Sequence, residues 1–90
     1  MTIRLTFEDI QDHNLPEGFE FLEERNYEIG FGDNIDTYVV RDLINNKTYA
    51  LSYTYNDRFG FEEDDFRIGT YDGEIATLWE CEYPVLTLID

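Results

Sequence analysis

Alternating apolar and polar residues, the period of a β-strand, recur over much of this chain. Two such rows lie before Gly32-Asp33-Asn34, which interrupts the pattern. We therefore expect strands over residues 2–8 and 27–31, each with one apolar face. The apolar members of the two rows are Ile3, Leu5, Phe7, Tyr27, Ile29 and Phe31.

The clearest local pattern is a hairpin in the middle of the chain. Residues 37–43 and 47–55 are rich in β-branched and aromatic side chains and flank Ile44-Asn45-Asn46. Asparagine tolerates a positive φ, so Asn45-Asn46 predicts a tight turn between two strands. Four large side chains of the second arm share one face, namely Tyr49, Leu51, Tyr53 and Tyr55.

A second pairing is expected near the C-terminus. Residues 66–71 and 76–83 flank Asp72-Gly73, a dipeptide typical of turns. Residues 85–89 continue beyond Pro84 and are expected to form a last strand.

Evidence for a helix is confined to Leu15–Asn26. Pro16 suits a first helical position, and Phe19 and Leu22 lie three residues apart. The alternation of Phe19 with Phe21 fits a strand equally well. The expected fold is α+β or mainly β, a bent antiparallel sheet or small barrel of about five to six strands with at most one short helix.

Composition indicates one ordered domain over residues 1–90. Aromatic residues make up 17% of the chain, whereas disordered acidic chains are poor in them. Cys81 is the only cysteine, which excludes an intramolecular disulfide and indicates a reducing compartment. The chain lacks the apolar run of a secretion signal and the roughly 20 apolar residues of a membrane span. We expect a cytoplasmic protein that binds no membrane, located in the host cytoplasm if it is phage-encoded.

Charge changes this picture most. The chain has 21 acidic and six basic residues, and its net charge of −15 exceeds the magnitude of roughly 2 to 8 that suits a small soluble domain. The local charge is −9 over residues 8–36, −4 over 57–65 and −5 over 72–90, but +1 over 37–56. This excess predicts a positively charged partner, which the acidic segments recognise while residues 37–56 serve as scaffold.

Two groups of acidic residues are the candidate partner-binding residues. Glu80 and Glu82 alternate with their neighbours and are expected to project from one face of a strand, about 6.7 Å apart, as spaced phosphates would. Changing both to lysine is then expected to weaken binding without unfolding the protein. The first group comprises Glu62, Glu63, Asp64, Asp65, Asp72, Glu74, Glu80 and Glu82. The second comprises Glu17, Glu20, Glu23 and Glu24.

Catalytic and metal-binding motifs are weak. His13 is the only histidine and lies in an acidic stretch, which favours a surface position over a general base. Cys81 is expected to point inward as a structural thiol. No glycine has the frame of an EF-hand loop, which leaves an irregular calcium site around residues 62–65 as an alternative. We expect a non-enzymatic protein without cofactor or metal. It should not bind nucleic acid directly, because six cations cannot offset 21 acids.

Two features resemble known proteins. The small size, the excess of acids and the aromatic, β-rich core resemble DNA-mimic proteins, many of them phage-encoded inhibitors of restriction, CRISPR or other DNA-binding machinery. The run from Trp79 to Thr87 and the segment from Asn46 to Leu51 are similar to small accessory proteins of tailed phages. The first resemblance implies carboxylates that stand in for phosphates, and the second implies no function.

These observations favour an acidic inhibitor, monomeric or homodimeric, that blocks the DNA- or RNA-binding groove of a basic protein. Two alternatives remain open. One is an immunity protein or antitoxin that neutralises a cationic toxin, which a neighbouring toxin gene would indicate. The other is a small structural or assembly protein of a phage, which a stable homo-oligomer without a basic partner would indicate.

Overall fold

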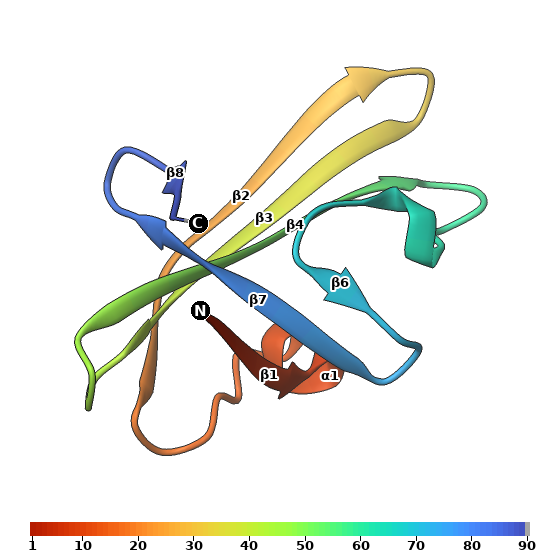
Figure 1. Ribbon diagram of the computed structural model, residues 1–90. Helices are drawn as coiled ribbons and strands as arrows, with labels where there is room; N and C mark the ends of the chain where they lie inside the picture. The colour runs from red at the N-terminus through yellow and green to blue at the C-terminus, as the bar shows by residue number, and fades with distance from the viewer. Residues whose placement is uncertain (90) are drawn as a thin grey trace.

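The computed structural model describes residues 1–89, apart from the side chain of Glu63, and consists of a twisted antiparallel sheet with a short helix on one face (Figure 1). Five strands form the body of the sheet in the order β1-β7-β4-β3-β2, and three shorter strands extend it. The sheet is open, so of the two expected forms the bent sheet is confirmed and the barrel is not. The strands are β1 (Thr2–Thr6), β2 (Phe19–Gly30), β3 (Asp33–Asp42), β4 (Lys47–Asn56), β5 (Phe66–Ile68), β6 (Thr70–Tyr71), β7 (Ile75–Glu82) and β8 (Thr87–Leu88).

The β2-β3-β4 meander is the longest part of the sheet, and its strands β3 and β4 are the most buried. β4 and β7 pair at one end only, through residues 48–50 and 79–81. Beyond that point they diverge, and β5 and β6 lie between them, β5 on β4 and β6 on β7. Within the described residues no strand pairs with the outer edge of β2.

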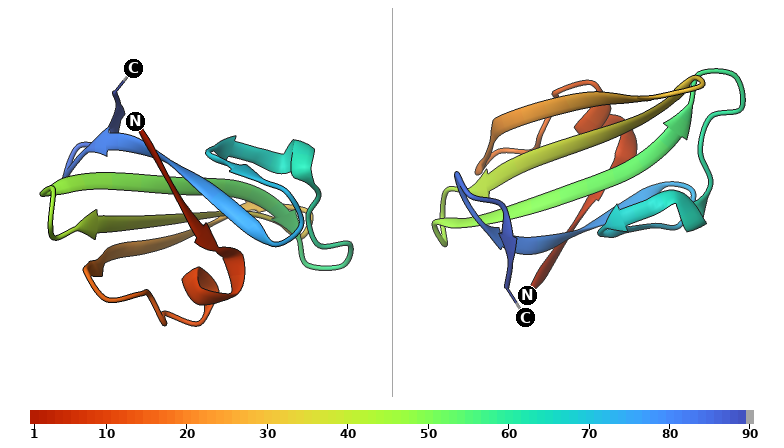
Figure 2. Two further views of the ribbon diagram at one scale, coloured as in Figure 1. Left: turned by 60° about the horizontal axis from the view of Figure 1, so that its bottom comes forward. Right: turned by 90° about the horizontal axis from the view of Figure 1, so that it is seen from above.

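The helix is not where the sequence predicted it. Helix α1 (Phe7–Gln11) begins where a strand was expected to end, and Thr6 caps it by accepting a hydrogen bond from the Asp9 N–H to its Oγ1 (3.3 Å). Phe7 and Ile10 of the helix are buried in the main core, and Figure 2 shows the helix lying against one face of the sheet. This five-residue helix, the only α-helix in residues 1–89, is too short to cross a membrane.

The helix predicted over Leu15–Asn26 is wrong because residues 19–30 are β2. Phe19 and Phe21 both pack against the main core, which an extended chain allows since alternate side chains share a face. A β-bulge between Phe21 and Glu23 then shifts the register by one residue. Beyond it, even-numbered residues of β2 lie on the face that α1 covers.

The main core lies between α1 and the sheet, and Phe7 is at its centre. Its ring centroid is 4.9–6.2 Å from those of four other rings, Tyr53, Phe61, Phe66 and Tyr71. The predicted row on the second hairpin arm contributes Tyr49, Leu51, Tyr53 and Tyr55 to this core, which confirms that prediction.

A smaller cluster covers the opposite face of the sheet. Val39, Ala50 and Cys81 are buried there beneath residues of the C-terminal segment. Cys81 is therefore the inward-facing thiol that the sequence predicted, and burial raises its pKa to about 11. The C-terminal strand is shorter than expected, since only β8 at residues 87–88 pairs with β7.

Both predicted turns are confirmed. Asn46 has a φ of 54° at the end of the β3–β4 turn, and Gly73 has a φ of 103° in the turn that precedes β7. Asp42 stabilises the first turn, since its Oδ1 accepts the Ile44 N–H (2.9 Å) and its Oδ2 accepts the Asn45 side-chain amide (2.9 Å). The hydrogen bond from the Asn45 side chain, and others from the backbone, hold the pKa of Asp42 below its usual value.

Candidate protein-binding site

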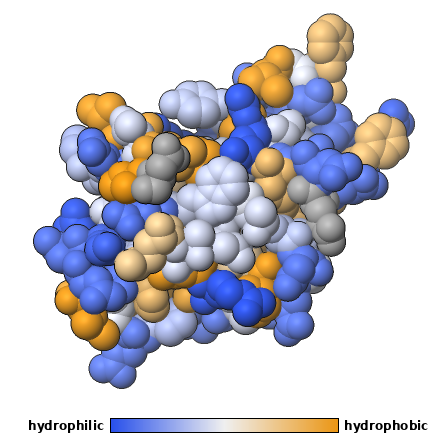
Figure 3. Space-filling view, viewed as in Figure 1, coloured by the Kyte–Doolittle hydropathy of each residue, from blue (hydrophilic) through white to orange (hydrophobic). Residues whose placement is uncertain are grey.

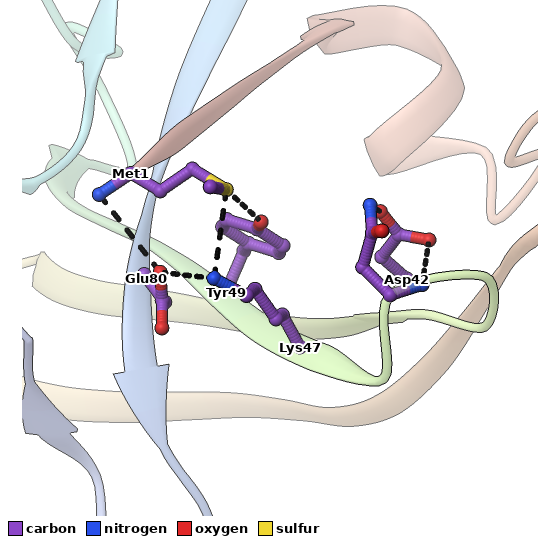
Figure 4. A network of polar contacts seen from close by, with 6 residues as sticks. Met1, Asp42, Lys47, Tyr49 and Glu80 are labelled. Atoms are coloured by element: carbon purple, nitrogen blue, oxygen red, sulfur yellow. Dashed lines mark hydrogen bonds and ion pairs between the residues drawn. The ribbon is translucent and has the colours of Figure 1, made fainter.

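Glu80 is not displayed to solvent beside Glu82, and that prediction is wrong. The register of β7 sets Glu80 opposite Tyr49, on the face of the main core, where its side chain is only 13% exposed. Its Oε1 lies 3.7 Å from the Lys47 Nζ and 3.9 Å from the Met1 amine (Figure 4). Glu80 is therefore paired with two cations of its own chain and is not available to a partner. Glu82, by contrast, is exposed.

Two other carboxylates of the first predicted group hold turns in shape. The Asp65 Oδ2 accepts the Glu62 N–H at 2.8 Å. The Asp72 Oδ1 accepts the N–H groups of Ile75 (2.7 Å) and Glu74 (3.0 Å), and these bonds lower the pKa of Asp72. Five members are exposed, namely Glu62, Asp64, Asp72, Glu74 and Glu82. The side chain of the remaining member, Glu63, lies outside the described part of the structure.

The second predicted group is not a single surface. Glu23 lies opposite Val39 and Glu24 opposite Tyr38, so these neighbours are on different faces of the sheet. Glu17 is exposed in the loop before β2. The other three each have a basic neighbour: Arg41 is 4.0 Å from Glu20, Arg25 is 2.7 Å from Glu23 and His13 is 2.6 Å from Glu24.

Three neighbouring cavities gather a different set of carboxylates, which we call the acidic band. A cavity of about 470 Å³ lies between α1 and the β6–β7 turn, and it shares Gln11 with a second of about 360 Å³. The second shares Tyr55, Asn56, Gly60 and Phe61 with a third of about 200 Å³. The band comprises Glu8, Asp9 and Glu74 in the first cavity, Asp36 and Asp57 in the second, and Asp33, Glu62 and Asp65 in the third. Among the described residues, no lysine, arginine or histidine lines any of the three.

Neutral donors hold the carboxylates of the second cavity in place. Asp36 accepts hydrogen bonds from the Asn26 amide (2.6 Å) and the Tyr53 hydroxyl (3.2 Å), and Asp57 accepts one from the Asn34 amide (2.8 Å). Burial raises the pKa of Tyr53, which keeps its hydroxyl a neutral donor at physiological pH. Amides and hydroxyls fix the orientation of a carboxylate without cancelling its charge.

The acidic band and the acids that form ion pairs are separate sets of residues. In the described part of the chain, six contacts join a basic group to a carboxylate, and none of them includes a member of the acidic band. The acids in these contacts are Glu20, Glu23, Glu24, Asp72 and Glu80, whereas Arg58 and Arg67 take part in none of the six. No ion pair among the described residues therefore offsets the negative charge of the band.

Three members of the band, Glu62, Asp65 and Glu74, were predicted from the sequence. Five were missed, namely Glu8, Asp9, Asp33, Asp36 and Asp57. A signal for some of them was present, because Asn34 follows Asp33 and Asn56 precedes Asp57 in the sequence, and these amides donate to the carboxylates across the hairpin.

Among the side chains that the structure describes, no three of His, Cys, Asp and Glu are grouped so as to hold a metal ion. No family model, curated protein or solved structure matches this chain. A proposal for the function of this protein therefore rests on the charge and shape of the acidic band.

Proposed function

We propose that this protein is a non-enzymatic inhibitor that occupies the nucleic-acid groove of a basic protein, with the carboxylates of the acidic band in place of phosphates. The observation that carries the proposal is the segregation of charge. Eight carboxylates line adjoining cavities that no described basic residue lines, and every ion pair among the described residues involves an acid outside the band.

The dimensions of the molecule support this proposal. Its longest axis is 40 Å. Duplex DNA of that length carries about 24 charges at one per 1.7 Å, the same order as the net charge of −15. Hydrogen bonds from amides hold Asp33, Asp36 and Asp57 on the stiff end of the meander, so a partner meets charges in fixed positions.

Electrostatic attraction of this kind makes association fast and sensitive to salt. The target should therefore release nucleic acid in proportion to the protein added, and the affinity should fall steeply as the ionic strength rises.

The test is a matched pair of triple variants with the same net charge. One carries E8Q, E62Q and E74Q within the band, and the other carries E17Q, E28Q and E82Q at exposed positions outside it. Basic proteins from host lysate are captured at low salt on each immobilised protein, and a captured nucleic-acid-binding protein is assayed for displacement of labelled DNA or RNA. We expect the band variant alone to lose displacement. Equal losses in both variants would show that total charge, not the band, is responsible.

A second candidate function is the neutralisation of a cationic toxin by an immunity protein or antitoxin. Apolar side chains exposed beside the band favour it, because a nucleic-acid backbone has no such groups. It predicts a partner whose binding is not competed by DNA or RNA.

A further inference from the structure

Two phenylalanine side chains project into solvent at the end of the meander where β2 turns into β3. Phe31 is fully exposed and Phe59, in the loop that follows β4, is 82% exposed. The Arg58 guanidinium lies over the ring of Phe59, 6.0 Å from the ring centroid. Figure 3 shows hydrophobic side chains projecting among hydrophilic ones at this end of the molecule.

Folding does not account for Phe31. Its φ is 55°, a left-handed conformation that is unfavourable for a bulky residue, and its neighbours Gly30 and Gly32 have φ values of 102° and 80°. Asparagine or glycine would adopt this conformation at less cost. An exposed ring also contributes no burial to stability. A strained, exposed and apolar residue is typical of a surface kept for binding.

The two loops that carry these rings are joined by hydrogen bonds. The Asp57 N–H donates to the Gly32 carbonyl at 2.8 Å, and the Asn34 amide donates to the Asp57 carboxylate. Asn56 donates to the Asp33 carboxylate (2.8 Å) and accepts the Phe59 N–H at 3.2 Å. The rings are therefore presented on connected backbones, which lowers the entropy lost on binding.

We infer that Phe31 and Phe59 are apolar anchors that enter a hydrophobic pocket of the partner, while carboxylates beside them bind lysine or arginine side chains at the rim of that pocket. Phe59 lines the same cavity as Asp33, Glu62 and Asp65, so the apolar and anionic contacts are adjacent. The inference rests on the proposed function for the charge of the partner. A second copy of this chain is the wrong occupant, because two molecules of charge −15 repel each other.

The probe is a displayed library of random 12-residue peptides, selected on the wild-type protein at low salt. We expect enriched peptides to combine Lys or Arg with Leu, Ile, Met or aromatic residues. Fluorescence anisotropy should show at least tenfold weaker binding of these peptides to the double variant F31A/F59A. The matched control is I44A/V85A, which removes two exposed apolar side chains elsewhere and should bind as wild type does.

The outcomes separate this inference from the proposed function. Basic peptides that bind F31A/F59A as tightly as wild type overturn the anchors but leave a cationic partner in place. Peptides that need the phenylalanines but carry no basic residues support the anchors and contradict the proposed charge of the partner. A library that yields no phenylalanine-dependent binder overturns the inference. So does a wild-type dimer in sedimentation that F31A/F59A abolishes, because the occupant is then a second copy.

Discussion

At the scale of single residues, Glu80 and Glu82 have different environments although they lie two positions apart on β7. Glu80 lies between two cations at the end of the main core, and Glu82 lies beyond it in solvent. Sequence alternation predicts which residues share a face, but it does not predict where the core ends along that face.

This difference is testable by charge reversal. Glu80→Lys places a third cation beside the Met1 amine and Lys47, so it should lower the free energy of unfolding by roughly 2 kcal/mol. The matched Glu82→Lys should change it by less than about 0.5 kcal/mol. Urea denaturation followed by circular dichroism measures both, and equal effects would contradict the assigned role of Glu80. Charge reversal is therefore expected to spare the fold at Glu82 but to destabilise it at Glu80, contrary to the expectation from the sequence that both reversals spare it.

The strain at Phe31 leads to a second prediction at this scale. Phe31→Asn should raise the free energy of unfolding by roughly 1 kcal/mol, since asparagine tolerates the left-handed region. Phe31→Ala removes the ring but keeps a Cβ at the same φ, so its stability should stay near wild type. Thermal melts of the three proteins give the comparison. A less stable asparagine variant would mean that the ring is needed for folding.

At the scale of elements, the close packing of the β5–β6 connection against β7 and β4 requires a glycine at position 69. An added Cβ would lie 2.5 Å from the Thr77 carbonyl oxygen and 2.7 Å from the Leu51 Cδ1, and the φ of Gly69 is 87°. Gly69→Ala should therefore destabilise the protein by about 3 kcal/mol or more. Gly73→Ala has a similar φ but an open environment, so it should cost only about 1 kcal/mol. Similar losses in both variants would show that conformational strain, not the close contact, dominates.

The β3–β4 turn gives a pH-dependent prediction. Hydrogen bonds lower the folded-state pKa of Asp42 below its usual 3.8, so its contribution to stability is present above about pH 4. That contribution is lost as the pH falls through the folded-state value. The stability difference between wild type and Asp42→Asn should accordingly shrink in acid. Asn45→Ala should raise the pKa of Asp42 as measured by NMR, and an unchanged pKa would rule out the Asn45 side chain as its main cause.

The sequence predicted correctly those strands and turns whose conformation depends on residues that are neighbours in the chain. The alternation from Tyr49 to Tyr55 and the left-handed Asn46 needed only neighbouring residues. The helix at Phe7–Gln11 had its own signal, Thr6 followed three residues later by Asp9, but the apolar alternation through Phe7 obscured it. Residues 19–30 form a strand despite the helix-favouring Pro16 and the spacing of Phe19 and Leu22, because a strand places the rings of both Phe19 and Phe21 against the core.

At the scale of the whole molecule, the acidic band was only partly predictable. Its members come from α1, from β3, from the segment between β4 and β5 and from the β6–β7 turn. Clusters that are contiguous in sequence, such as residues 62–65, were visible, whereas Glu8 and Glu74 meet only because β1 pairs with β7. Which carboxylates have basic neighbours also depends on the fold.

The net charge itself leads to a prediction for the intact protein. Self-repulsion opposes folding, and salt screens it, so the Tm should rise between about 10 mM and about 300 mM NaCl. A gain of about 1 kcal/mol corresponds to roughly 4–8 °C for a domain of this size. The triple variant E17Q/E28Q/E82Q should show a smaller rise, because it starts with less repulsion. A Tm that is flat or falls with salt would mean that attractive ion pairs dominate.

In the part of the chain that the structure describes, the outer edge of β2 pairs with no strand, and the negative charge along this edge affects whether molecules can assemble through it. Along its twelve residues, alternate residues direct backbone donors and acceptors outward, where they could pair with the same strand of another molecule, which is how fibrils grow. Glu20, Glu24 and Glu28 recur along this edge at intervals of four and would meet like charges in any such stack. Replacing these three side chains with glutamine would remove that barrier, so the triple variant should form fibrils more readily than the wild-type protein does.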